Sequence, residues 1–181
     1  MPRKNEIDML HGPLLAKIII FAMPLAASSI LQQLFNSVDV AVVGRFDSSY
    51  ALAAVGSNGP VISLLINLFL GISMGANVVI SNHIGQKDNN LTKYAIRTTA
   101  ATALFSGLAL AVIGVLAARP ILTIMGTPTE VLDMAVRYLR IYFIGTPFLL
   151  IYNFGSAILR SKGDTSRPLY ILIVAGIINT V

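Results

Sequence analysis

The sequence contains no cysteine, and only 12% of its 181 residues are charged, against about 25% in an ordinary soluble domain. The absence of cysteine excludes disulfide bonds and thiol chemistry. The scarcity of charge argues against a soluble domain, because too few polar groups are available to face water. Hydrophobic residues make up 55% of the chain and the mean hydropathy is +0.77, so we expect lipid to be the solvent for most of it.

The patterns that usually carry catalysis or cofactor binding are also missing. The sequence has no Walker phosphate-binding loop, no cluster of metal-ligating side chains and no Ser-His-Asp arrangement. Its net charge of +5 is distributed between apolar runs instead of forming one basic stripe, which argues against nucleic acid as a partner. We therefore predict no enzymatic activity, no metal site, no cofactor and no nucleic-acid partner.

Long apolar runs dominate what is present. A helix needs about 20 residues to cross the hydrocarbon core of a bilayer, and four runs are long enough. A fifth run has only 14 residues and is expected to be a truncated span. The sequence therefore predicts an all-α, polytopic transmembrane helix bundle. The predicted spans are residues 14–43, 53–84, 98–118, 131–159 and, as the truncated fifth, 168–181.

Prolines and glycines within these runs predict local features of the helices. Pro24 lies inside the first span, where its missing amide hydrogen predicts a kink. Residues 119–120 (Arg-Pro) predict the end of the third span, with a short helical continuation to Met125 as the alternative. Gly71 and Gly75 are one turn apart in the second span, a spacing that lets another helix approach closely.

Basic residues predict the orientation of the spans, because lysine and arginine favour the cytoplasmic side of a membrane. Most of them fall on the side of the N-terminus, which is therefore expected to be cytoplasmic. Nine lie on that side, namely Arg3, Lys4, Lys17, Lys87, Lys93, Arg97, Arg160, Lys162 and Arg167. Four lie on the other side, namely Arg45, Arg119, Arg137 and Arg140.

The first span has a polar stripe that ends in an acidic residue. At 100° per residue, all of its polar side chains except Ser37 fall within an arc of about 140°. Asp39 is the only acidic residue deep within an apolar run. A charge at the centre of a bilayer costs about 2.5–3.5 kcal/mol, so a bound cation, a proton or a basic partner must offset it. The stripe consists of Ser28, Ser29, Gln32, Gln33, Asn36 and Asp39.

Asp39 therefore predicts a site that exchanges H⁺ or Na⁺, because burial raises the pKa of a carboxyl group and a nearby cation lowers it. A position at the membrane interface, as an ordinary helix-end residue, is the alternative. Polar side chains of the fourth span, namely Tyr138, Tyr142, Thr146 and Asn153, predict a lined cavity, although an interfacial aromatic belt would also explain the tyrosines. The second span contains Asn67. The fifth contains Asn179, which is expected to bond to another helix or to be an ordinary packing amide.

Taken in chain order, a set of short motifs resembles the multidrug and toxic compound extrusion (MATE) family of efflux transporters. The resemblance covers essentially the whole chain, and its specificity comes from the order of the motifs. They are Pro24-Leu25, QQLFN at 32–36, Val38-Asp39, VVGR at 42–45, LAAVG at 52–56, Gly71, Gly75-Ala76-Asn77, GQKD at 85–88, YLRI at 138–141, GTPF at 145–148, and LRSKGDT at 159–165 followed by Pro168.

The resemblance implies twelve transmembrane helices in two six-helix lobes. Residues 1–181 would form an incomplete N-terminal lobe with four helices and most of the fifth, and the remaining helices would be partners of the chain. Asp39 would match the first-helix acid that couples transport to a cation or proton, with Asn179 and Tyr138 near it. The family's fifth-helix aspartate would follow Val181. The candidate substrate cavity would comprise Gln32, Gln33, Asn36, Asn67, Tyr142 and Asn153.

The predicted function is antiport across the inner (plasma) membrane. Drug-like, often cationic, organic compounds would leave by alternating access, in exchange for H⁺ or Na⁺ and without a further cofactor. A lipid-linked oligosaccharide flippase of related fold is one alternative, but it should need cationic groups in its cavity to hold pyrophosphate. A scaffold subunit without transport activity is another alternative, and it would leave Asp39 without a purpose.

Overall fold

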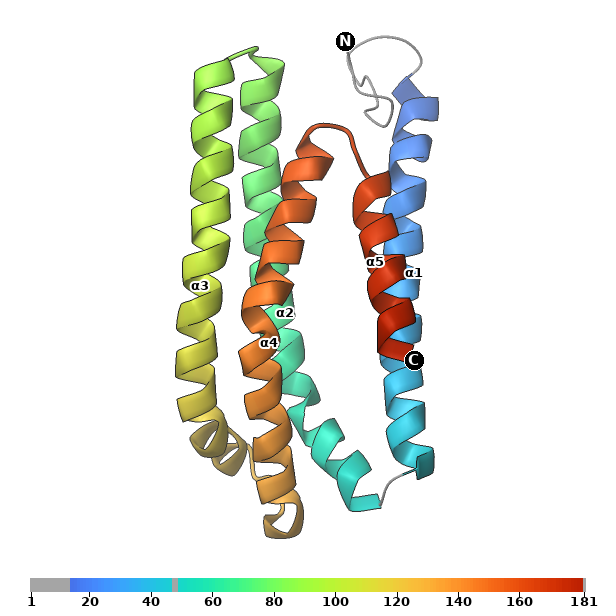
Figure 1. Cartoon of the computed structure of the whole chain (residues 1–181), viewed down its shortest axis with the longest axis vertical. Coiled ribbons are helices and arrows are strands. Elements are labelled where there is room, and N and C mark those ends of the chain that lie inside the picture. The colour runs from blue at the N-terminus through green and yellow to red at the C-terminus, as the bar shows by residue number, and fades with distance from the viewer. Residues whose placement is uncertain (1–13, 47–48, 181) are drawn as a thin grey trace. The chain divides into compact units, whose positions relative to one another are not determined.

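The computed structural model describes residues 14–46 and 49–180, with side chains for residues 14–45 and 50–178. All elements in this part of the chain are helices (Figure 1), which confirms the all-α class. Four of them are long and apolar enough to cross a membrane, and the fifth is shorter, as predicted. The helices are α1 (Leu14–Phe46), α2 (Ser49–Gly85), α3 (Asn89–Ile124), α4 (Thr129–Ser161) and α5 (Ser166–Thr180).

The structure corrects the predicted end of the third span. Helix α3 continues through Pro120 to Ile124 without a break, so residues 119–120 do not end it and the predicted continuation is correct. A proline removes only one backbone hydrogen bond, to the carbonyl four residues earlier, and its fixed φ is itself helical. The helix ends instead at Ile124, two residues before Gly126, whose φ of 75° lies in the left-handed region that favours glycine.

Residues 162–165 form a hydrogen-bonded turn between α4 and α5. Gly163 has a φ of 80° and ends α4, and Asp164 then caps α5. One carboxylate oxygen of Asp164 accepts the backbone amide of Arg167 at 3.1 Å, and the other pairs with the Arg167 Nε at 3.1 Å. The Asp164 side chain is 2% exposed, so its charge depends on these contacts.

The chain divides into two compact units, each of which takes segments from several helices. Among the described residues, the first unit contains 14–38, 74–97 and 155–180. The second contains 39–46, 49–73 and 98–154.

Close contact between α3 and α4 forms the interior of the second unit. A Cβ on Gly107 would lie 2.8 Å from Cα of Pro147, and a Cβ on Gly114 would overlap the ring of Phe143. Small residues therefore allow the two helices to approach, which is the main device for helix packing in lipid. The buried core beside this contact consists of Ala54, Ala118, Leu122, Val131, Ala135, Val136, Leu139 and Phe143.

Helix contacts in the first unit use one aromatic ring and one amide. The ring of Phe35 on α1 packs against Gly176 on α5 so closely that a Cβ on Gly176 would overlap it. Asn77 on α2 donates to the carbonyl of Ala157 on α4 at 2.9 Å. Both contacts join helices that are distant in sequence.

The Gly71 and Gly75 motif makes no close contact within the described residues. Nothing there lies within 4 Å of a Cβ built on either glycine. The predicted packing role of this pair therefore stays a prediction for segments outside the described residues. The tight contacts that the structure does contain are at Gly107 and Gly114, which the sequence analysis did not single out.

Asn58 on α2 is fully buried and joins α2 to α4 in the second unit. Its Nδ2 donates to the carbonyls of Ala54 at 2.8 Å and Ala135 at 3.2 Å, whereas its Oδ1 is buried without a partner. The sequence analysis missed this residue. The burial of Asn58 could have been predicted from its helical spacing with Ala51, Ala54 and Leu65, which places it on an apolar face.

We expect Asn58→Leu to change the free energy of unfolding by less than about 1 kcal/mol. Interhelical hydrogen bonds in membranes are weak, and the substitution also removes an unsatisfied buried oxygen. Asn58→Ala should cost more, because it removes the same bonds and leaves a void. Thermal unfolding of the purified full-length protein measures both effects. A larger loss for the leucine variant than for the alanine variant would contradict this account.

Candidate functional site

Helix α4 presents a face of polar side chains within the second unit. Tyr138, Tyr142 and Thr146 follow one another at four-residue spacing, which places them on one face of the helix. Thr146 is buried and its hydroxyl donates to the carbonyl of Phe143 at 2.7 Å. Asn153 lies about two turns further along and is also buried. The predicted cavity-lining residues of the fourth span therefore lie on one helix face.

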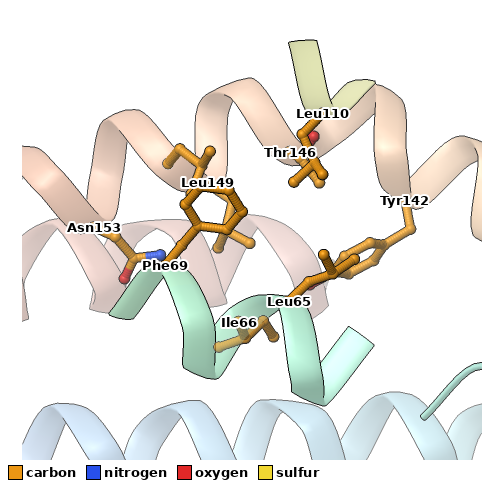
Figure 2. A pocket seen from close by; sticks show the side chains of 9 residues that line it. Leu65, Ile66, Phe69, Leu110, Tyr142, Thr146, Leu149 and Asn153 are labelled. Atoms are coloured by element: carbon orange, nitrogen blue, oxygen red, sulfur yellow. The ribbon is translucent and has the colours of Figure 1, made fainter. Parts of the chain in front are cut away.

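A small cavity lies between this face of α4 and helices α2 and α3 (Figure 2). Its volume is about 10 Å³, the space of about one water molecule. Figure 2 shows Tyr142 and Asn153 at opposite ends of the labelled group, with Thr146 between them. Almost all of the wall that faces this space is apolar, so the cavity is expected to stay dry. The lining is completed by Leu65, Ile66, Phe69, Leu110, Leu149 and Leu150.

Asp39, the predicted coupling acid, lies on α1 seven residues before the end of the helix, and its side chain is exposed. Like Tyr138 and Tyr142, it belongs to the second unit. Within the described residues the Asp39 carboxylate has no ion-pair partner, so no arginine or lysine there offsets its charge. The second unit thus contains both the predicted coupling acid and the polar face of α4.

Four other residues predicted for the site lie on α1 and α2. Gln32, Gln33 and Asn36 are exposed on the α1 segment of the first unit. Asn67 is exposed on α2, and its amide donates within its own helix to the Ser63 carbonyl at 2.8 Å. None of these four residues lines the small cavity.

Two further predicted residues, Asn179 and Pro24, belong to the first unit. Asn179 is in the last turn of α5, and its side chain lies outside the described residues. Pro24 lies inside α1, and the hydroxyl of Ser28 donates to the Pro24 carbonyl at 2.8 Å. A serine that bonds back to the carbonyl four residues earlier often accompanies helix bending. In the part of the chain that the structure describes, no three His, Cys, Asp or Glu side chains are grouped as metal ligands.

Known proteins resemble this chain in sequence and in fold. The sequence model of the family described as MatE matches residues 24–181. The Probable multidrug resistance protein YoeA of Bacillus subtilis (strain 168) is 37% identical over 160 residues, which cover 88% of this chain and 35% of that protein. The chain therefore spans about a third of the length of this curated relative.

Two solved structures share the fold. Crystal structures of a MATE protein in the straight and in the bent conformation match with TM-scores of 0.81 and 0.80. Each is 25% identical to this chain and matches 88% of it. The match covers 35% of the straight structure's chain and 36% of the bent one's.

Proposed function

The chain belongs to the MatE family, and on this premise we propose that it forms part of an antiporter that exports drug-like organic cations in exchange for H⁺ or Na⁺. The observation that carries the proposal is Asp39, an acidic residue inside the membrane-spanning helix α1 of a family member. The relative named as a multidrug resistance protein supports the substrate class.

In this proposal, the coupling ion binds at Asp39. The carboxylate accepts a proton or pairs with Na⁺, and either removes the cost of an isolated charge in lipid. Tyr138, which belongs to the same unit as Asp39, is the candidate second member of the coupling site. Asn179 on α5 is the candidate third member. Tyr142 and Asn153 belong to the substrate cavity, with Gln32, Gln33, Asn36 and Asn67 as its candidate wall on α1 and α2.

Alternating access requires a helix that adopts two shapes. Pro24 is the candidate bend point, because the backbone bond missing at a proline lowers the cost of bending there. The related structures in straight and bent conformations support this choice. We further propose that the protein lies in the inner (plasma) membrane with its N-terminus in the cytoplasm, since Lys87, Lys93 and Lys162 would then face the cytoplasm.

Transport in membrane vesicles tests the proposal. We expect ethidium, a fluorescent organic cation, to be moved by vesicles that contain the full-length protein when one gradient, of H⁺ or of Na⁺, is imposed. The same vesicles with that gradient collapsed by an ionophore are the control, and they should not move it. If neither gradient drives ethidium in vesicles where the protein is present and folded, the antiporter proposal is wrong.

A further inference from the structure

A second, larger cavity lies in the second unit, and the proposed transport function does not use it. It is a groove of about 540 Å³ between α2, α3 and α4. Its lining residues are all Leu, Ile, Val, Ala, Pro, Gly, Met or Phe, so no side chain there can donate or accept a strong hydrogen bond. A ligand for this groove must therefore be entirely apolar where it is bound.

The groove is long and opens to the side. Phe143 lines it and is 2% exposed, whereas Leu64 on α2 and Ile113 on α3 line it and are 67% and 61% exposed. Its lining on α3 extends from Leu110 to Ile121, which spans about 17 Å at a rise of 1.5 Å per residue, and Met125 lines it just beyond the end of the helix. Half of a hydrocarbon core is about 15 Å thick, so the groove is about as long as one leaflet is thick.

The groove is also narrow. A volume of about 540 Å³ divided by a length of about 17 Å gives a mean cross-section of about 32 Å². That is close to the section that one hydrocarbon chain occupies in a fluid bilayer. An α-helix with its side chains is about 10–12 Å across and would need more than about twice this section. The groove is therefore too narrow to enclose another helix of this protein or of a second copy.

We propose that this groove binds one acyl chain of a membrane phospholipid. Water is excluded, because apolar cavities stay dry. An organic cation is also excluded, because the groove lacks the few convergent polar groups that hold such a molecule in a pocket. The hydrophobic effect does not drive the binding, since the surrounding lipid is equally apolar. The acyl chain is held because an empty groove would deprive its wall of dispersion contacts along its whole length.

The groove adjoins the small cavity between α2, α3 and α4. Leu65 and Leu110 line both of them. An acyl chain in the groove thus supports, from behind, two side chains of the wall that also contains Tyr142 and Asn153. The bound lipid is in this way a packing element for the small cavity, whether or not that cavity binds a transported substrate.

Ala117 and Leu116 provide a matched pair of variants. Ala117 lines the groove, whereas its neighbour Leu116 is 73% exposed and does not line it. Native mass spectrometry of the full-length protein, purified in a mild detergent, counts its retained phospholipids. We expect Ala117→Phe to retain one phospholipid fewer than the wild type, and Leu116→Phe to retain the wild-type number. An unchanged count in Ala117→Phe, or an equal loss in both variants, would overturn the proposal.

A second measurement needs no substitution. A phosphatidylglycerol with a photoreactive diazirine near the end of one acyl chain is incorporated into membranes with the wild-type protein and activated by light. We expect crosslinks on the groove residues Leu64, Ile113 and Ala117. Crosslinks on Leu116 without any on the groove residues would mean that lipid only surrounds the helices. Protection of the groove residues by ethidium would assign the groove to the transported compound, and either result overturns the proposal.

Discussion

Asp39→Asn is expected to reduce gradient-driven efflux by at least about tenfold, the equivalent of about 1.4 kcal/mol. Asparagine has almost the same size and shape as aspartate, so helix α1 should keep its structure. It cannot take up a proton or neutralise Na⁺, and the coupling step proposed for this position would be lost. The measurement is ethidium efflux in vesicles under the gradient that drives the wild-type protein, normalised to the amount of folded protein.

Asp133→Asn is the matched control for this variant. Asp133 is near the start of α4, its side chain is 79% exposed, and it pairs with Arg119 at 3.1 Å on the surface. Exposed ion pairs contribute little, so we expect wild-type efflux from this variant. If Asp39→Asn also extrudes ethidium at the wild-type rate, Asp39 does not couple transport. Its role would then be structural, and a flippase or a scaffold would explain the chain better.

The spanning helices could be predicted from the sequence because length and hydropathy are local properties. Each of α1 to α4 needs only an apolar run that exceeds the thickness of the bilayer, whatever its neighbours are. Helix ends depend on finer effects. A proline such as Pro120 predicts the end of a helix, yet α3 continues past it. Only one backbone hydrogen bond is lost at the proline, and the residues on either side keep theirs.

The candidate site was predictable only where it follows one helix. The four-residue spacing of Tyr138, Tyr142 and Thr146 defines a face of α4 without reference to any other helix. By contrast, the distance of Asp39 from this face depends on how α1 packs against α4, which spacing along one helix cannot supply. The same limit explains why Asn58 was missed, since its partner Ala135 is 77 residues away.

Glycine motifs show this limit most clearly. Gly71 and Gly75 have the spacing that favours helix packing, yet nothing in the described residues lies against them. Gly107 and Gly114 are seven residues apart, and they contact α4. Whether a glycine is needed depends on the side chain that faces it, which here is Phe143 for Gly114. A substitution at Gly114 therefore measures this contact directly.

Gly114→Leu is expected to lower the free energy of unfolding by about 3 kcal/mol, at the upper end of the cost of overpacking. Even the Cβ of the new side chain would overlap the Phe143 ring. That ring is 2% exposed and has little room to move away, so α3 and α4 must separate. The measurement is the melting temperature of the purified full-length protein, which should fall by several degrees.

Two further variants decide whether the Phe143 contact causes this loss. Gly145→Leu on α4 is the control, because nothing lies within 4 Å of a Cβ there, and it should leave the melting temperature unchanged or slightly raised. In a Phe143→Ala background, the ring is gone and leucine at position 114 can occupy part of its space. Gly114→Leu should then cost much less than it does in the wild type, which a double-mutant cycle measures as coupling. If Gly114→Leu costs the same in both backgrounds, the loss of stability does not come from the contact with Phe143.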